Sequence, residues 1–251
     1  MKILVFCLLT VLLHASTLHA GKITIAVAAN VSYAIEDLKK AFQVSNPDTK
    51  VQVILGSSGK LTAQIMHGAP YELFMSADMK YPETLYEKKL AGTKPVVYAE
   101  GTLAMLSQKK HNCCAELFVL KSPSIKKIAI ANPKTAPYGI ATKEALENAK
   151  LYEKVKDKLV YGESISQTLS FTIHAADIGI IATSALFSPK MKHYKEAIHW
   201  SQVDEKLYTP IKQGIVILKK GEKSMEVKAF YDFMLSKEAK KILSSFGYKV
   251  K

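Results

Sequence analysis

The chain has 251 residues, of which 48% are hydrophobic and 23% are charged, so it is long enough to bury a substantial core. Its formal net charge is +13, and all 35 basic residues are lysines. Guanidinium groups are the usual bidentate readers of phosphate, carboxylate and guanine. The absence of arginine therefore argues against a nucleic-acid-binding protein, and we expect no nucleic-acid partner.

The first 20 residues differ from the rest of the chain. Lys2 precedes an apolar run, Ile3 to Leu13, that is too short to span a bilayer, and small residues lead to Ala20. The pattern predicts a signal peptide over residues 1–20, with a retained N-terminal anchor as the alternative. An exported chain with so few cysteines points to the periplasm.

Two cysteines remain after residue 20, and they are neighbours, Cys113 and Cys114. A disulfide between adjacent residues is strained, and the spacing of a four-ligand zinc site is absent. We interpret the pair as an incidental feature of a loop.

Short apolar strands alternate with amphipathic helices after Gly21. The sequence predicts strands over residues 22–28, 51–55 and 73–75, and helices over about 34–42, 60–66 and 81–88. Such alternation favours a parallel sheet covered by helices, and therefore an α/β fold.

The pattern restarts around residues 98–101. Strands are expected over residues 103–107, 127–131, 178–182 and 211–218, and helices over 140–148, 165–173, 227–234 and 239–246. Gly247 lies where a helix C-terminal glycine belongs. We expect two lobes around a crevice, with residues 21–98 plus 208–251 in the first and 99–207 in the second.

Four places share one local design, in which a strand ends, small or polar residues follow, and a helix begins. They are residues 28–32, 56–59, 137–139 and 163–166. The start of a helix leaves unpaired backbone N–H groups, and its dipole favours an anion. Asn30, Ser58 and Ser164 could each be a simple helix cap, so the inference depends on the four turns together.

These turns also carry a family resemblance that runs from about Lys22 to the end of the chain. The most specific block comprises Ser57-Ser58-Gly59-Lys60-Leu61, Gly68-Ala69-Pro70 and Leu73-Phe74-Met75-Ser76-Ala77-Asp78. Further matches are the opening strand to Asn30, Pro137-Tyr138-Gly139-Ile140 and Asp177-Ile178-Gly179-Ile180. The chain resembles the periplasmic molybdate-binding proteins of bacterial molybdate ABC transporters, which have the two-lobed type II periplasmic binding protein fold.

The resemblance implies a monomer without catalytic activity or cofactor, which binds molybdate or tungstate between its lobes and delivers it to an ABC permease at the inner membrane. It implies four oxyanion-binding residues, Asn30, Ser58, Tyr138 and Ile165. Asn30 would donate through its backbone N–H and also its side-chain amide, Ser58 through hydroxyl and backbone, and the other two through backbone N–H. Some members of the family place a ligand tyrosine where this chain has Ala182.

The physical chemistry of the anion agrees with this donor set. Molybdate is a fully ionised tetrahedral dianion near neutral pH, so it needs hydrogen-bond donors and no acceptor. Molybdate and tungstate are nearly equal in size, and the sequence does not separate them. Lys60 could add charge beside the Ser58 turn, although a solvated helix residue is its simpler interpretation.

Other functions fit the sequence less well. Residues 56–61 are too short for a P-loop, and a serine hydrolase would need a nucleophile elbow that the chain lacks. The scattered histidines argue against a metal-binding transport protein, and Asp78 is expected to be a structural acceptor rather than a ligand. Binding of another oxyanion, such as sulfate or phosphate, and a metal-binding transport protein stay open as the alternatives.

Overall fold

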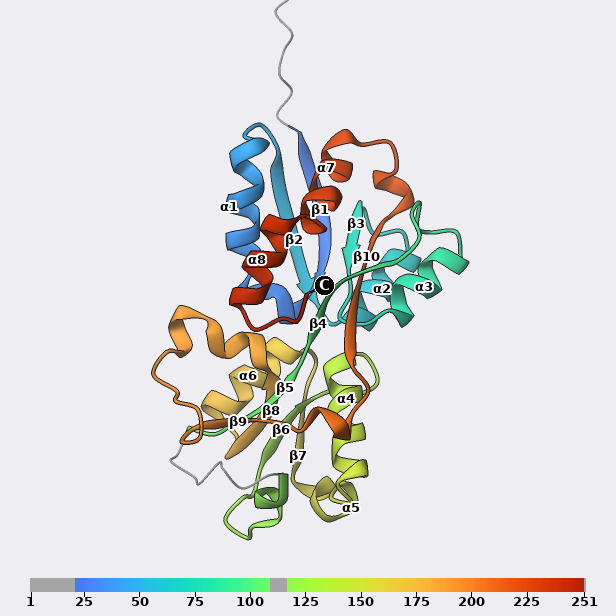
Figure 1. Ribbon diagram of the computed structural model, residues 1–251. Coiled ribbons are helices and arrows are strands. Elements are labelled where there is room, and N and C mark those ends of the chain that lie inside the picture. The colour runs from blue at the N-terminus through green and yellow to red at the C-terminus, as the bar shows by residue number, and fades with distance from the viewer. Residues whose placement is uncertain (1–20, 109–116, 251) are drawn as a thin grey trace, which may run out of the picture.

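The computed structural model describes residues 21–108 and 117–250 (Figure 1). The expected signal peptide and the Cys113–Cys114 pair lie outside these residues. Within the described ranges, no helix is both long and apolar enough to cross a membrane. The chain forms two lobes, each built on a five-stranded sheet that is covered by helices (Figure 1).

The sheet of the first lobe has the strand order β2-β1-β3-β10-β4. Its strands are β1 (Lys22–Ala28), β2 (Lys50–Gly56), β3 (Leu73–Met75), β4 (Val96–Gly101) and β10 (Ile211–Ile217). β1 pairs in parallel with β2 and β3, whereas β10 runs antiparallel to β3 and β4. The expected parallel sheet is therefore correct only for β1 to β3, because β10 enters from the second lobe and not through a βαβ crossover.

Helices cover both faces of this sheet. They are α1 (Ile35–Ser45), α7 (Met225–Met234) and α8 (Lys237–Ser245) on one face, and α2 (Ser58–Met66) and α3 (Lys80–Glu87) on the other. The alternation along β1 explains the layering, because Ile25 and Val27 share a core cluster with Phe42 of α1, whereas Ala26 packs with Leu61 of α2.

The sheet of the second lobe has the order β7-β6-β8-β5-β9. Its strands are β5 (Leu103–Leu106), β6 (Ile128–Ala131), β7 (Leu159–Gly162), β8 (Ile178–Ala182) and β9 (Trp200–Gln202), and its helices are α4 (Pro137–Asn148), α5 (Tyr152–Val155) and α6 (Ile165–His174). β6 pairs in parallel with β7 and β8, and β5 runs antiparallel to β8 and β9. This sheet is mixed as well.

The start of α4 differs from the sequence expectation. The helix was expected from Ile140 but begins at Pro137, a residue that suits a first helical turn because it lacks an N–H. Gly139 is inside the helix, where a Cβ would lie 2.3 Å from the carbonyl oxygen of Ala131 at the end of β6. The glycine serves close packing of helix on strand and not a turn.

Two connections join the lobes. The chain passes from β4 to β5 through Thr102 alone and returns between β9 and β10 (Figure 1). At the first connection, a Cβ on Gly101 would lie 2.0 Å from the hydroxyl oxygen of Tyr138 in α4. The first lobe thus contacts the start of α4 at the point where the chain passes from β4 to β5.

Candidate anion-binding site

The four strand–turn–helix segments meet at one small cavity between the lobes. Its lining residues are Ala28, Ala29, Asn30, Gly56, Ser57, Ser58 and Ala77 from the first lobe, and Ala136, Pro137, Tyr138 and Ile165 from the second. All four residues singled out from the sequence, Asn30, Ser58, Tyr138 and Ile165, are among them. The cavity has a volume of about 10 Å³, roughly the space for one water molecule, so it excludes sugars and peptides.

Three α-helices begin at this cavity. Ser58 is the first residue of α2, Tyr138 the second of α4, and Ile165 the first of α6. The N–H groups of a first helical turn have no acceptor within their own helix, and the helix dipole adds partial positive charge there. Helices from both lobes therefore present donors to the same small space.

Asn30 follows β1 in a short 3₁₀-helix, η1 (Ala29–Tyr33), and does not cap it. Its Nδ2 donates to Gln213 Oε1 at 2.9 Å and to the hydroxyl of Tyr248 at 3.0 Å. Both hydrogens of the amide are thus engaged within the protein. The backbone N–H of Asn30 is the donor that remains for a ligand, in place of the side-chain amide considered from the sequence.

Ser58 is fully buried, and its hydroxyl oxygen accepts a hydrogen bond from the backbone N–H of Ala77 at 2.9 Å. Because the oxygen acts as acceptor in that bond, its own hydrogen stays available for another acceptor. Ala77 belongs to the Ser-Ala-Asp turn after β3, so this neighbouring turn fixes the position of the Ser58 hydroxyl.

The cavity lining carries no formal charge. Tyr138 is its one ionisable residue, and burial, reinforced by the nearby phenols, raises the pKa of Tyr138 well above its usual value. Lys60 does not line the cavity, and its Nζ lies 2.6 Å from Glu163 Oε1 of the second lobe. About half of each of these side chains is exposed, so the pair is screened by solvent.

A buried group of polar side chains lies behind the cavity and joins the lobes. Gln213 Oε1 accepts from Asn30 and from the hydroxyl of Tyr98 at 2.8 Å, while its Nε2 donates to the hydroxyl of Tyr138 at 3.2 Å. The hydroxyl of Tyr248 donates to the carbonyl of Asn30 at 2.8 Å. Gln213 was not predicted from the sequence. A Gln-Gly pair that interrupts an apolar strand does indicate a β-bulge, and the register between β10 and β4 shifts at this pair.

Hydrogen bonds also cross the cleft around the cavity. The N–H of Gly59 donates to the carbonyl of Thr135 at 2.9 Å, and the hydroxyl of Ser166 donates to the carbonyl of Ala29 at 2.8 Å. These bonds link segments that line or flank the cavity, so the two lobes are held against each other around it.

The other residues considered in the sequence analysis do not contribute to the cavity. Ser164 caps α6 by accepting from the N–H of Gln167, and Asp78 Oδ1 accepts from the hydroxyl of Ser76 at 3.0 Å. Ala182 ends β8 and is not part of the cavity lining. Within residues 21–108 and 117–250, no three His, Cys, Asp or Glu side chains gather in a way that could hold a metal ion.

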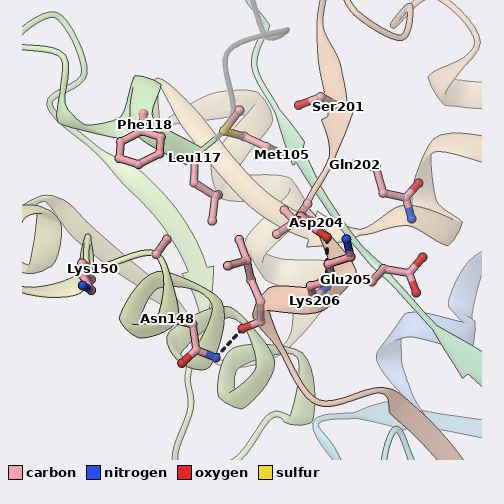
Figure 2. Close-up of a pocket in the computed structure, with 13 residues that line it drawn as sticks. Met105, Leu117, Phe118, Asn148, Lys150, Ser201, Gln202, Asp204, Glu205 and Lys206 are labelled. Atoms are coloured by element: carbon pink, nitrogen blue, oxygen red, sulfur yellow. Dashed lines mark hydrogen bonds between the residues drawn. The ribbon is translucent and has the colours of Figure 1, made fainter.

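A wider pocket of about 660 Å³ lies in the second lobe, apart from the four turns (Figure 2). Its walls combine apolar residues such as Met105 and Phe118 with the oppositely charged Asp204 and Lys206. Asn148 on its rim donates through Nδ2 to the carbonyl of Leu207 at 2.8 Å (Figure 2). Among the described residues, no α-helix begins in its lining and α4 ends there, so the small interlobe cavity is the better candidate site.

Comparison with known proteins agrees with this architecture. The sequence pattern of the bacterial extracellular solute-binding proteins matches residues 23–249. The chain belongs to this family. Two curated relatives of this solute-binding protein are molybdate-binding proteins. The protein of Azotobacter vinelandii is 35% identical, and the match covers 94% of this chain and 93% of the relative. The protein of Rhodobacter capsulatus is 36% identical, and the match covers 91% of this chain and 88% of the relative.

A solved structure of a relative has the same fold as this solute-binding protein. The periplasmic molybdate-binding protein of Azotobacter vinelandii superposes with a TM-score of 0.83 at 30% identity, over 91% of this chain and 99% of the other. The two-lobed α/β fold of periplasmic binding proteins, expected from the sequence, is therefore confirmed. These relatives are molybdate-binding proteins.

Proposed function

We propose that this protein binds molybdate or tungstate in the cavity between its lobes and delivers the anion to an ABC permease at the inner membrane. It acts in the periplasm as a monomer, after removal of residues 1–20, and it has neither catalytic activity nor cofactor. Asn30, Ser58, Tyr138 and Ile165 are the binding residues. The meeting of three helix N-termini from two lobes at one uncharged cavity carries the proposal.

The chemistry of the cavity supports a doubly charged guest. Backbone and hydroxyl donors form charge-assisted hydrogen bonds with a dianion, and three helix dipoles add partial positive charge without a mobile cation. A neutral lining also avoids the strong attraction for any passing anion that a lysine would create. Selection against sulfate then depends on the size of the cavity, since sulfate is the smaller tetrahedron.

A protonated oxyanion is the second candidate ligand, because one buried acceptor atom is left without a partner. Asn30 Oδ1 is buried and has no hydrogen-bond partner within the described part of the chain. Such an acceptor could take the proton of hydrogen phosphate, which molybdate lacks. Phosphate binding therefore ranks ahead of metal binding as the alternative.

Isothermal titration calorimetry of the purified protein tests the proposal. Molybdate and tungstate should bind with similar affinity, and sulfate, phosphate, zinc and ferric ions should bind at least tenfold more weakly, a difference of about 1.4 kcal/mol. Tightest binding of phosphate would favour the second candidate. Failure of both molybdate and tungstate to bind would overturn the proposed function.

A further inference from the structure

We propose that Ser57, which precedes the expected ligand Ser58, is an additional donor that binds the oxyanion through its side-chain hydroxyl. The inference rests on the proposed function, and it adds a second hydroxyl donor to a site otherwise built mainly from backbone donors. Ser57 is 4% exposed and lines the cavity directly, together with Ser58 and Asn30.

The first observation is that Ser57 occupies a capping position without capping. It is the N-cap residue of α2, with extended backbone angles of φ −68° and ψ 148°, yet its side chain accepts no hydrogen bond from the first turn. An N-cap serine normally accepts from the N–H two or three residues later. Ser164, Ser224 and Ser236 do so at α6, α7 and α8. The N-terminus of α2 is thus left uncapped, beside the cavity.

The second observation is that the Ser57 hydroxyl is buried and unpartnered. Three buried side-chain atoms have no hydrogen-bond partner in the described part of the chain, namely Asn30 Oδ1, Ser57 Oγ and Thr135 Oγ1. Ser57 and Asn30 line the cavity, and Thr135 precedes the lining residue Ala136. A buried hydroxyl without a partner costs about 1–3 kcal/mol, so the Ser57 hydroxyl at the cavity points to a guest that accepts its hydrogen.

The chemistry of the two adjacent serines differs accordingly. Ser58 Oγ accepts from the N–H of Ala77, whereas Ser57 Oγ has no hydrogen-bond partner among residues 21–108 and 117–250. A hydroxyl can rotate its hydrogen toward an anion and form a charge-assisted bond. Ser57 and Ser58 therefore supply two hydroxyl donors from the same helix start, next to the N–H groups of α2.

The test compares Ser57→Ala with the wild-type protein by molybdate calorimetry and by urea unfolding of the ligand-free protein. The variant should bind molybdate about tenfold or more weakly, because a hydrogen bond to a charged group is lost. Tungstate affinity should fall by a similar factor, since both anions present a tetrahedron of oxygens. The urea midpoint of the ligand-free variant should equal or exceed that of the wild type, because no hydrogen bond within the protein is removed.

Ser236→Ala is the matched control, because Ser236 caps α8 of the same lobe by accepting from the N–H of Ala239 at 3.2 Å. It should lower the urea midpoint and leave the molybdate affinity unchanged, the opposite pattern to Ser57→Ala. Wild-type affinity in Ser57→Ala would overturn the inference, as would a midpoint lowered together with the affinity. If the wild-type protein bound neither molybdate nor tungstate, the proposed function itself would fail instead.

Discussion

The backbone N–H of Gly59, in the first turn of α2, donates to the carbonyl of Thr135 in the opposite lobe at 2.9 Å. The contact leaves no room for a side chain, since a Cβ on Gly59 would lie 2.9 Å from that oxygen and 3.0 Å from the Cα of Thr135. Both atoms belong to the backbone, so they cannot turn aside. The lobes can meet at this point only because residue 59 is glycine.

Gly59→Ala should weaken binding of molybdate by about tenfold or more. The added methyl group would overpack the place where the two lobes meet around the cavity, and overpacking costs about 1–3 kcal/mol. The stability of the ligand-free protein should not fall, since alanine is the better helix former and the Tyr81 hydroxyl, which a Cβ would approach to 2.7 Å in the same lobe, ends a flexible side chain. Calorimetry and urea unfolding measure the two effects. Unchanged affinity would mean that the lobes bind the anion without this contact.

Ser58→Ala should weaken binding of the anion by about 1–3 kcal/mol, because a hydrogen bond from its hydroxyl to a charged group is lost. The substitution also removes the acceptor of the Ala77 N–H, so a modest loss of stability should accompany it. Calorimetry with molybdate measures the affinity, and Ser124→Ala, at an exposed serine of the second lobe, is the control. Equal affinity in wild type and Ser58→Ala would remove Ser58 from the site.

Gln213→Leu should lower the free energy of unfolding by about 3 kcal/mol. The hydroxyls of Tyr98 and Tyr138 and the Nδ2 of Asn30 would each lose a buried hydrogen bond, at about 1–3 kcal/mol for a group left unsatisfied. Urea unfolding measures the change, with Gln202→Leu at an exposed position as the control. Coincident unfolding curves for wild type and Gln213→Leu would show that this buried group contributes nothing to stability.

Stability should fall steeply at alkaline pH. Burial raises the pKa of the phenols of Tyr98, Tyr138 and Tyr248 above the usual value near 10. Between pH 10 and these raised pKa values the folded protein keeps protons that the unfolded chain has released, so the stability present below pH 10 is lost as pH rises.

The variant Tyr98→Phe removes one of these three groups and provides the measurement. Its free energy of unfolding should fall less steeply above pH 10, by about 1.4 kcal/mol per pH unit relative to the wild type. Urea unfolding between pH 8 and pH 11 gives both slopes. Parallel curves would show that Tyr98 titrates alike in the folded and unfolded states.

Local patterns predicted much of the fold, including the four turns that meet at one cavity, and the family resemblance named Asn30, Ser58, Tyr138 and Ile165 within them. Ser58 and Ile165 follow short apolar strands and open amphipathic helices, so nearby residues alone indicate their position at a helix start. The direction of β10 could not be predicted in this way, because it depends on which strand lies beside it after a long excursion through the second lobe.

The buried group of polar side chains around Gln213 could not be predicted from the sequence either. Gln213 contacts Asn30 across 183 residues of chain and Tyr138 across 75, and no local periodicity encodes such pairings. The role of Ser57 is equally invisible in the sequence, since a serine before a helix usually caps it, and only the structure shows that this one does not. The sequence predicts the start of α4 too late, because a proline followed closely by a glycine is typical of a turn, whereas Gly139 allows close packing on β6.

The division of the cavity lining between the lobes determines how cargo can be unloaded. Asn30 and Ser58 belong to one wall, and Tyr138 and Ile165 to the other, so neither wall alone surrounds a guest. A transporter that draws the walls apart would remove the donors of one wall at once and admit water in their place. Unloading would then need only mechanical separation, without any competing anion or change in protonation.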